Sequence, residues 1–263
     1  MKVSVIVPTY NRSAKLAETI ESIKRNDFPK SEFEIIIVND NSSDDTEEIV
    51  KRLVRGCKNI KYLRNAKNLG PAGARNRGIK ISRGEFVFFT DDDCIVPKNW
   101  IKTYASFFEK HKNVAGIGGL LEPAAKNFIA RMEMLKDRVL GLKADKIIIS
   151  RSAPMGFTNN VAYRKEVFNS VGCFSEKFKI PGGEDPEFKS RAAGKFDMAF
   201  IPLVVKHNHS YNLDYILGIT FKQGLEMKPP KSLLLKIILL ALLSPLLVFN
   251  IIRKTIKYRF GKL

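Results

Sequence analysis

Three consecutive aspartates, Asp91, Asp92 and Asp93, follow the apolar run from Phe86 to Phe89 after a single threonine. Neighbouring carboxylates repel one another, and a carboxylate that leaves water without a partner is strongly disfavoured. A divalent cation such as Mg²⁺ or Mn²⁺ would let them stay ionised together, with substrate phosphates completing its shell. The triplet therefore predicts a metal site and a nucleotide-diphosphate substrate. A solvated acidic loop is the alternative.

The direction of each carboxylate can also be predicted. Alternate residues of an extended chain face the same way. If the chain stays extended after Phe89, Asp91 and Asp93 point to one site and Asp92 points elsewhere.

A second acidic pair, Glu184 and Asp185, follows directly on Gly182 and Gly183. Glycines permit a close approach of substrate to the backbone, and the two acids then open an expected helix. A carboxylate held in this place could act as a general base, or it could serve only as a helix cap.

The elements that must position these acids alternate along the first part of the chain. The segments that read as strands are 3–7, 34–38, 60–63 and 86–89. The helical patterns between them are 13–25, 44–55 and 72–82. Apolar strands joined by helices indicate an α/β fold whose parallel sheet carries helices on both faces. Ligands of such sheets bind at the carboxyl ends of the strands, which here are 8–11, 39–40 and 91–93.

Ordered stretches of the sequence resemble the motifs of family-2 glycosyltransferases. The nucleotide-binding half of that family is matched by VSVIVPTYNRS, IIIVNDNSSDDT, NLGPAGARNRGIKISRGEF and VFFTDDDCIVP. Its acceptor region and its ED motif are similar to GFTNNVAYRKEVFNSVGCFSEKF and GGEDPEFKSRAAG. The resemblance covers residues 1 to about 210 and implies the GT-A fold, a Rossmann-like, mostly parallel sheet flanked by helices.

The resemblance assigns the base and ribose of a nucleotide-sugar donor to Pro8, Thr9 and Tyr10. An aromatic ring beside a base is also a physically reasonable stacking platform. Asp40 would accept a hydrogen bond from a base N–H. Its alternative role is an N-cap for the helix expected at 44–55.

The family's nucleotide-contacting loop is matched by Gly70, Arg75 and Asn76, although Arg75 could instead be a plain surface charge. By the same resemblance, Asp91 would contact the ribose or the metal. Asp92 is counted with the nucleotide-binding residues, although it is expected to point away from the metal.

The resemblance makes Asp93 the metal ligand that bridges to the diphosphate, with Cys94 standing where the family often has another acid. A histidine at the distance of His207 sometimes completes the metal site in related enzymes. His207 and His209 could equally have a structural or surface role. The expected cofactor is Mg²⁺ or Mn²⁺.

The catalytic residues implied by the resemblance are Asp185, which matches the family's base, and its neighbour Glu184. Inverting sugar transfer needs one base to take the proton of the acceptor hydroxyl. The residues expected to line the acceptor cleft are Asn159 and Asn160.

The charge of the chain favours a membrane surface as its general partner. The formal net charge is +18, and the part from Tyr211 to Leu263 holds nine Lys or Arg against two acids. All of these basic residues except Lys236 flank the most apolar segment, 232–252, so anionic lipid is favoured over nucleic acid. Nucleic-acid binding would call for a basic stripe interleaved with aromatics, and the sequence shows none outside the tail.

The segment 232–252 is predicted to be a membrane segment. At about 1.5 Å per residue, a helix of this length reaches roughly 30 Å, which is enough to cross a bilayer. Lys236 and the pair Ser244 and Pro245 interrupt it, so both a kinked span and a re-entrant anchor stay open. A buried helix of a soluble domain is the alternative.

The sequence thus divides into parts with different expected roles. They are a GT-A domain at 1–215 with a nucleotide-binding half at 1–97 and an acceptor half at 98–215, a basic linker at 216–231, the membrane segment at 232–252 and a basic tail at 253–263. Three cysteines without a CxxC pair favour a reducing compartment. The expected location is the cell membrane, with the catalytic domain facing the cytoplasm.

The resemblance and the charge pattern together predict a metal-dependent inverting glycosyltransferase. Its donor would be a nucleotide-diphosphate sugar, most often a UDP-sugar in this family. Its acceptor would be a sugar hydroxyl, and the basic and apolar C-terminal part favours a lipid-linked one. The alternative is a non-catalytic, membrane-associated protein that binds nucleotide sugars. The presence of both Asp93 and Asp185 argues against that alternative.

Overall fold

The computed structural model describes residues 1–125, 130, 146–178 and 183–209. Nearly all of them belong to one compact unit, made of 1–124 and 141–208. The predicted basic linker 216–231, membrane segment 232–252 and basic tail 253–263 lie outside the described residues. Within the described part of the chain, no helix combines the length and the apolar character needed to cross a membrane.

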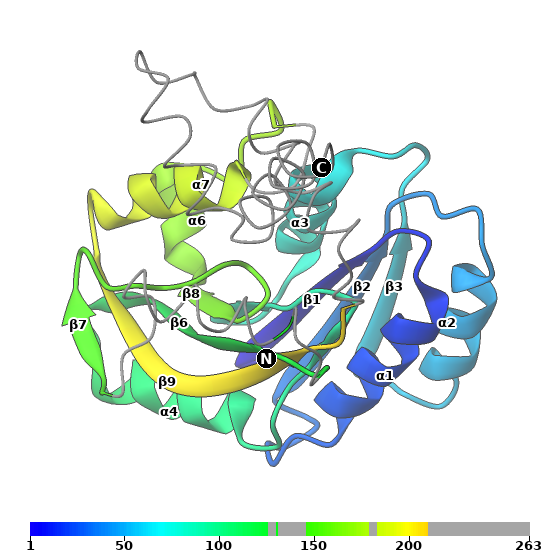
Figure 1. Cartoon of the computed structure of the whole chain (residues 1–263), viewed down its shortest axis with the longest axis horizontal. Helices are drawn as coiled ribbons and strands as arrows, with labels where there is room; N and C mark the ends of the chain where they lie inside the picture. The colour runs from blue at the N-terminus through cyan, green and yellow to red at the C-terminus, as the bar shows by residue number, and fades with distance from the viewer. Residues whose placement is uncertain (126–129, 131–145, 179–182, 210–263) are drawn as a thin grey trace, which may run out of the picture. The chain divides into compact units, whose positions relative to one another are not determined.

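The first half of the sheet is parallel, as predicted. Its strands lie in the order β3-β2-β1-β4 (Figure 1). Their bounds are β1 Val3–Thr9, β2 Phe33–Asn39, β3 Ile60–Arg64 and β4 Phe86–Phe89. All three pairings are parallel, with Val5 of β1 beside Ile35 of β2 and Phe88 of β4. The carboxyl ends of these strands therefore meet at one edge of the sheet.

The second half of the sheet is mixed, so the expectation of a mostly parallel sheet holds only for the first half. The strands that continue from β4 are β8 Val161–Arg164, β6 Val114–Pro123, β9 Asp197–His207 and β5 Cys94–Ile95, and β7 Ile148–Ser150 pairs with β9. β8 is antiparallel to both β4 and β6, whereas β6 and β9 are parallel. The strand–helix alternation that produces parallel pairing ends at β4, where a turn leads directly into β5.

Helices cover both faces of the sheet (Figure 1). One face packs against α1 Ser13–Lys24, α2 Thr46–Val54 and α4 Trp100–Lys110. The other packs against α3 Gly70–Ile81, α6 Lys165–Val171 and α7 Glu184–Ala193. Because strand side chains alternate, Val5 of β1 enters the first core and its neighbour Ile6 enters the second. Burial on both faces explains why the strands read as continuous apolar runs.

Candidate active site

The loops that follow β1 and β2 are fastened to each other at the carboxyl edge of the sheet. The backbone N–H of Asn11 donates to Ser42 Oγ at 2.9 Å, and the N–H of Ser43 donates to Asn11 Oδ1 at 2.8 Å. Asn11 adopts a φ of 52°, a left-handed conformation that asparagine tolerates well. Tyr10 therefore sits on a fixed loop with 47% of its surface exposed, as a stacking platform would require.

Asp40 organises the start of α3. Its carboxylate accepts hydrogen bonds from Asn65 Nδ2 at 2.7 Å and from the backbone N–H groups of Leu69 at 2.9 Å and Gly70 at 2.8 Å. Gly70 has a φ of 79°, which favours glycine. The alternative of an N-cap for the helix after Asp44 is wrong, because Asp44 itself accepts from the N–H of Thr46.

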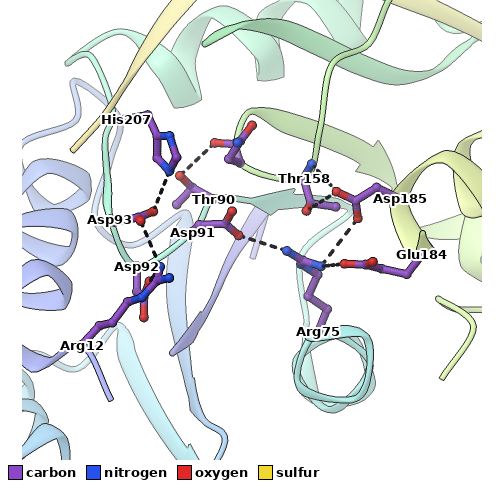
Figure 2. A network of polar contacts seen from close by, with 11 residues as sticks. Arg12, Arg75, Thr90, Asp91, Asp92, Asp93, Thr158, Glu184, Asp185 and His207 are labelled. Atoms are coloured by element: carbon purple, nitrogen blue, oxygen red, sulfur yellow. Dashed lines mark hydrogen bonds and ion pairs between the residues drawn. The ribbon is translucent and has the colours of Figure 1, made fainter. Parts of the chain in front are cut away.

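The three aspartates do not continue β4 as an extended segment. The backbone N–H of Cys94 donates to the carbonyl of Asp91 at 3.2 Å, so the triplet forms a turn between β4 and β5. Strand alternation therefore does not apply, and Asp91 and Asp93 contact different partners within the site. Asp91 points towards Arg75, whereas Asp93 points towards His207 (Figure 2).

Asp92 and Asp93 both form ion pairs with Arg12, a residue that was not predicted to belong to the site. Arg12 Nη1 lies 3.2 Å from Asp92 Oδ1 and 2.9 Å from Asp93 Oδ2. The hydroxyl of Thr9 donates to Asp92 Oδ2 at 2.7 Å. Burial raises the pKa of Asp92 to about 6, although Arg12 and the Thr9 hydroxyl oppose the rise. Asp92 therefore belongs to the site, where it is buried against Thr9 and Arg12.

Asp93 and His207 form the part of the site that suits a cation. The Nε2 atom of His207 lies 3.2 Å from Asp93 Oδ1. Adjacent ligands that each lie about 2.1 Å from an octahedral ion are about 3.0 Å apart, so the observed spacing fits a shared ion. A carboxylate oxygen with an imidazole nitrogen is a donor pair that suits Mn²⁺. The residues present therefore fit a divalent cation.

Cys94 is the third potential ligand in this cluster. Its Sγ lies with the ligand atoms of Asp93 and His207 inside a group whose members are all within 4.8 Å of one another. Cys94 pairs with His207 across β5 and β9, which explains the proximity. Burial raises the pKa of the Cys94 thiol well above its usual range.

Arg75 connects Asp91 of the aspartate turn to the second acidic pair. Its guanidinium lies 3.0 Å from Asp91, 2.8 Å from Glu184 and 3.5 Å from Asp185 (Figure 2). The arginine is buried, so the alternative of a plain surface charge is wrong. Burial alone would lower the pKa of Arg75, but the carboxylates of Asp185, Asp91 and Glu184 raise it.

Asp185 is held in place by Thr158. The backbone N–H and the hydroxyl of Thr158 donate to Asp185 Oδ2 at 3.0 and 2.7 Å. Burial raises the pKa of the carboxyl, against the opposing effect of Arg75. Both Thr158 bonds use Oδ2, and Oδ1 lies 3.5 Å from Arg75 Nη1. Glu184 is more deeply buried and pairs with Arg75, which gives it a positioning role.

Glycines of β6 allow the Thr158 loop to lie directly on the sheet. A Cβ atom at Gly118 would come within 1.8 Å of the carbonyl oxygen of Met155. A Cβ atom at Gly119 would come within 2.3 Å of the Tyr104 hydroxyl and 2.6 Å of Asn160 Nδ2. The glycine-rich strand therefore sets the position of the loop that carries Thr158.

The predicted acceptor residues differ from each other in their surroundings. Asn160 accepts from Trp100 and Tyr104 at 2.9 Å each and donates to two backbone carbonyls, so its amide has no bonding capacity left for an acceptor. Its contacts make Asn160 structural. Asn159 is 8% exposed, and its carbonyl accepts from the Thr90 hydroxyl at 3.0 Å.

Asn76 also fastens the fold. Its side chain donates to the carbonyl of Phe174 and to Glu176 at 2.9 Å each and accepts from the N–H of Phe174 at 3.0 Å. These bonds tie α3 to the segment after α6.

Two residues of the site escaped prediction. Arg12 follows the Thr9 loop, and Thr158 precedes Asn159 in a stretch that already resembled an acceptor region. Neither residue type is unusual in a loop, so only the spatial contacts reveal them. The structure thus brings together the turn at 91–93, Arg12, Arg75, His207 and the Glu184–Asp185 pair (Figure 2).

The sequence from residue 4 to residue 172 matches the profile of Glycosyl transferase family 2. The match covers more than half of the chain, and the protein therefore belongs to this family. The resemblance inferred from the ordered motifs is confirmed.

The chain is similar in sequence to known glycosyltransferases. It is 36% identical over 149 residues to the poly(ribitol-phosphate) β-N-acetylglucosaminyltransferase TarS of Staphylococcus aureus, covering 53% of this chain and 26% of TarS. It is 47% identical over 93 residues to the GalNAc(5)-diNAcBac-PP-undecaprenol β-1,3-glucosyltransferase of Campylobacter jejuni, covering 35% of this chain and 29% of that protein. The matches thus span less than a third of either relative.

Solved structures share the fold. Residues 1–349 of TarS in complex with UDP-GlcNAc give a TM-score of 0.62 at 24% identity, covering 88% of this chain and 68% of that one. A mannosyltransferase from Pyrobaculum calidifontis in complex with GDP-Man and Mn²⁺ gives a TM-score of 0.67 at 20% identity, covering 87% of this chain and 66% of that one. At these identities the likeness establishes the fold.

Proposed function

We propose that the protein is an inverting glycosyltransferase that moves a sugar from a nucleotide-diphosphate sugar to an acceptor hydroxyl. The observation that carries the proposal is the junction at Arg75. This buried guanidinium lies 3.0 Å from Asp91 on the donor side and 3.5 Å from Asp185, which is held by Thr158. A donor-binding turn and a candidate base thereby belong to one site.

Asp185 supplies the base for the transfer. Its carboxylate takes the proton of the acceptor hydroxyl while the acceptor oxygen bonds to the anomeric carbon on the face opposite the diphosphate. The bond from the anomeric carbon to the diphosphate oxygen breaks, and its electron pair leaves with the nucleoside diphosphate. Because burial raises the pKa of Asp185, the carboxylate is a better proton acceptor than an exposed aspartate.

The other residues bind and orient the donor. Asp93 and His207 would hold a divalent cation, which when bound stabilises the negative charge of the departing diphosphate. Tyr10 is exposed on its loop and would stack on the base. The hydroxyl of Thr9 holds the aspartate turn in place by donating a hydrogen bond to Asp92. The bound UDP-GlcNAc of TarS favours a UDP-sugar as the donor here.

A donor screen with metal removal tests the proposal. The purified protein is incubated with UDP-, GDP- and dTDP-sugars and Mn²⁺, and release of nucleoside diphosphate is measured. We expect turnover of at least one UDP-sugar, loss of turnover after treatment with a chelator, and recovery when Mn²⁺ is restored, because Asp93 and His207 fit a cation.

Two results would contradict this proposal. Turnover that is unaffected by the chelator would show that the reaction does not need a metal ion. Binding of nucleotide sugars without hydrolysis or transfer, across a range of sugar and lipid-linked acceptors, would favour the alternative of a non-catalytic binding protein.

We further propose a lipid-linked acceptor and attachment to the cytoplasmic face of the membrane. The apolar segment 232–252 and its basic flanks support this proposal, since such flanks bind anionic lipid. The Campylobacter relative acts, by its name, on an undecaprenol-linked glycan.

Membrane attachment predicts that deletion of the chain from Ser232 onward releases the protein. We expect the full chain to sediment with vesicles containing anionic lipid and the shortened chain to stay in the supernatant, because the deletion removes the apolar segment together with its basic tail. Equal partitioning of the two chains would refute the attachment.

A further inference from the structure

Arg12 occupies the side of the aspartate turn that faces away from His207. Its Nη1 lies 2.9 Å from Asp93 Oδ2, while His207 lies 3.2 Å from Asp93 Oδ1 (Figure 2). The two groups therefore approach different oxygens of one carboxylate. The Arg12 side chain is 42% exposed, so it can reach solvent from this position.

In this arrangement, Arg12 would compete with a metal ion at Asp93 and His207 for the carboxylate of Asp93. The guanidinium already neutralises part of the charge of Asp92 and Asp93, and it would repel a divalent ion bound to the same carboxylate. The conflict ends when a diphosphate arrives, because its negative oxygens can contact the metal and the guanidinium together.

We propose that Arg12 couples metal binding to donor binding. Without a donor it competes with the cation for Asp93, and with a donor it contacts the diphosphate. The inference rests on the proposed function, because it takes the metal and the diphosphate from that function. It makes Arg12 a positioning residue for the donor.

Asp92 keeps Arg12 in reach during the exchange. Its carboxylate is buried and is fixed by the Thr9 hydroxyl at 2.7 Å, and it holds Arg12 at 3.2 Å through a different oxygen. When a cation takes Asp93, the contact with Asp92 can remain. Arg12 then stays beside the diphosphate instead of leaving the site.

The test measures two affinities of full-length wild type and Arg12→Ala. The Kd for Mn²⁺ is measured by electron paramagnetic resonance without nucleotide, and the Kd for UDP by calorimetry at saturating Mn²⁺. We expect Arg12→Ala to bind Mn²⁺ on the order of tenfold more tightly and UDP on the order of tenfold more weakly, the size of one close charge interaction.

The matched control is Arg52→Ala, which removes the same charge from an exposed side chain of α2 that lies 3.9 Å from Glu48. It should leave both affinities at the wild-type values. Local damage at Arg12 would weaken both ligands together, so only opposite changes support the coupling. Unchanged or weaker Mn²⁺ binding by Arg12→Ala overturns this inference alone. Failure of wild type to bind either Mn²⁺ or nucleotide overturns the proposed function as well.

Discussion

Asp185→Asn is expected to lower the rate of sugar transfer by a factor on the order of 10²–10⁴, which is the usual contribution of a positioned general base. Asparagine keeps an oxygen that can accept the two hydrogen bonds of Thr158, so the loop should stay in place. It cannot take a proton from the acceptor. The loss should appear in kcat, while donor affinity measured by calorimetry should change little.

The pH dependence gives a second signature of the same residue. Burial raises the pKa of Asp185, so the acidic limb of kcat/KM should lie above the value of about 4 that is ordinary for aspartate. The folded protein holds this proton more tightly than the unfolded chain does. Ionised Asp185 therefore costs stability above its raised pKa, and the cost disappears as the pH falls below the ordinary range.

The stability consequence separates lost chemistry from lost folding. At neutral pH, Asp185→Asn removes the cost of a buried charge, and Arg75 still pairs with Asp91 and Glu184. Thermal unfolding of this variant should thus occur at no lower temperature than that of wild type. The matched control is Glu187→Gln, which lies on the same helix and pairs with Arg191, and it should retain most activity. Transfer by Asp185→Asn at the wild-type rate would exclude Asp185 as the base.

The polar residues at the strand ends were predictable because their signals are local. Apolar runs buried on both faces mark β1, β2 and β4, and polar residues follow each of them directly. The topology of a parallel sheet then requires those ends to meet. Thr9, Asp40 and Asp93 were found in this way, since each stands at the end of a strand or in the turn after it.

The rest of the site depends on contacts between distant segments. Arg75 and Glu184 are separated by 109 positions, and Arg12 and Asp93 by 81. No periodicity links such residues. The turn at 91–93 was misjudged for a related reason. Whether a chain stays extended after a strand depends on its partners, and here β5 pairs with β9 far along the sequence.

Arg75 is where the two parts of the site depend on each other most strongly. Asp91 comes from the turn after β4, and Glu184 and Asp185 come from the start of α7. These carboxylates would repel one another without a cation between them. Because Arg75 is buried among them, we expect it to affect both folding and the proposed sugar transfer.

Arg75→Met is therefore expected to lower the free energy of unfolding by about 3–5 kcal/mol at neutral pH, the usual cost of leaving buried charges without their partner. Methionine fills much of the volume but offers no positive charge to Asp91, Glu184 and Asp185. Arg75 holds down the pKa of Asp185, so the pKa of Asp185 rises further without the arginine. The destabilisation should shrink as the pH falls and Asp185 takes up a proton. Denaturant unfolding at several pH values measures both effects.

Two companion variants make this expectation decisive. Arg83→Met removes an exposed arginine that lies 3.3 Å from Glu34, a carboxylate that Lys61 also contacts at 2.8 Å, so it should cost less than about 1 kcal/mol. Arg75→Lys keeps the charge but cannot bond three carboxylates with a planar fork, so it should fall between wild type and Arg75→Met. If Arg75→Met instead unfolds like Arg83→Met at neutral pH, the three carboxylates do not depend on Arg75. The proposal that Arg75 joins the donor-binding turn at Asp91 to the base Asp185 would then fail.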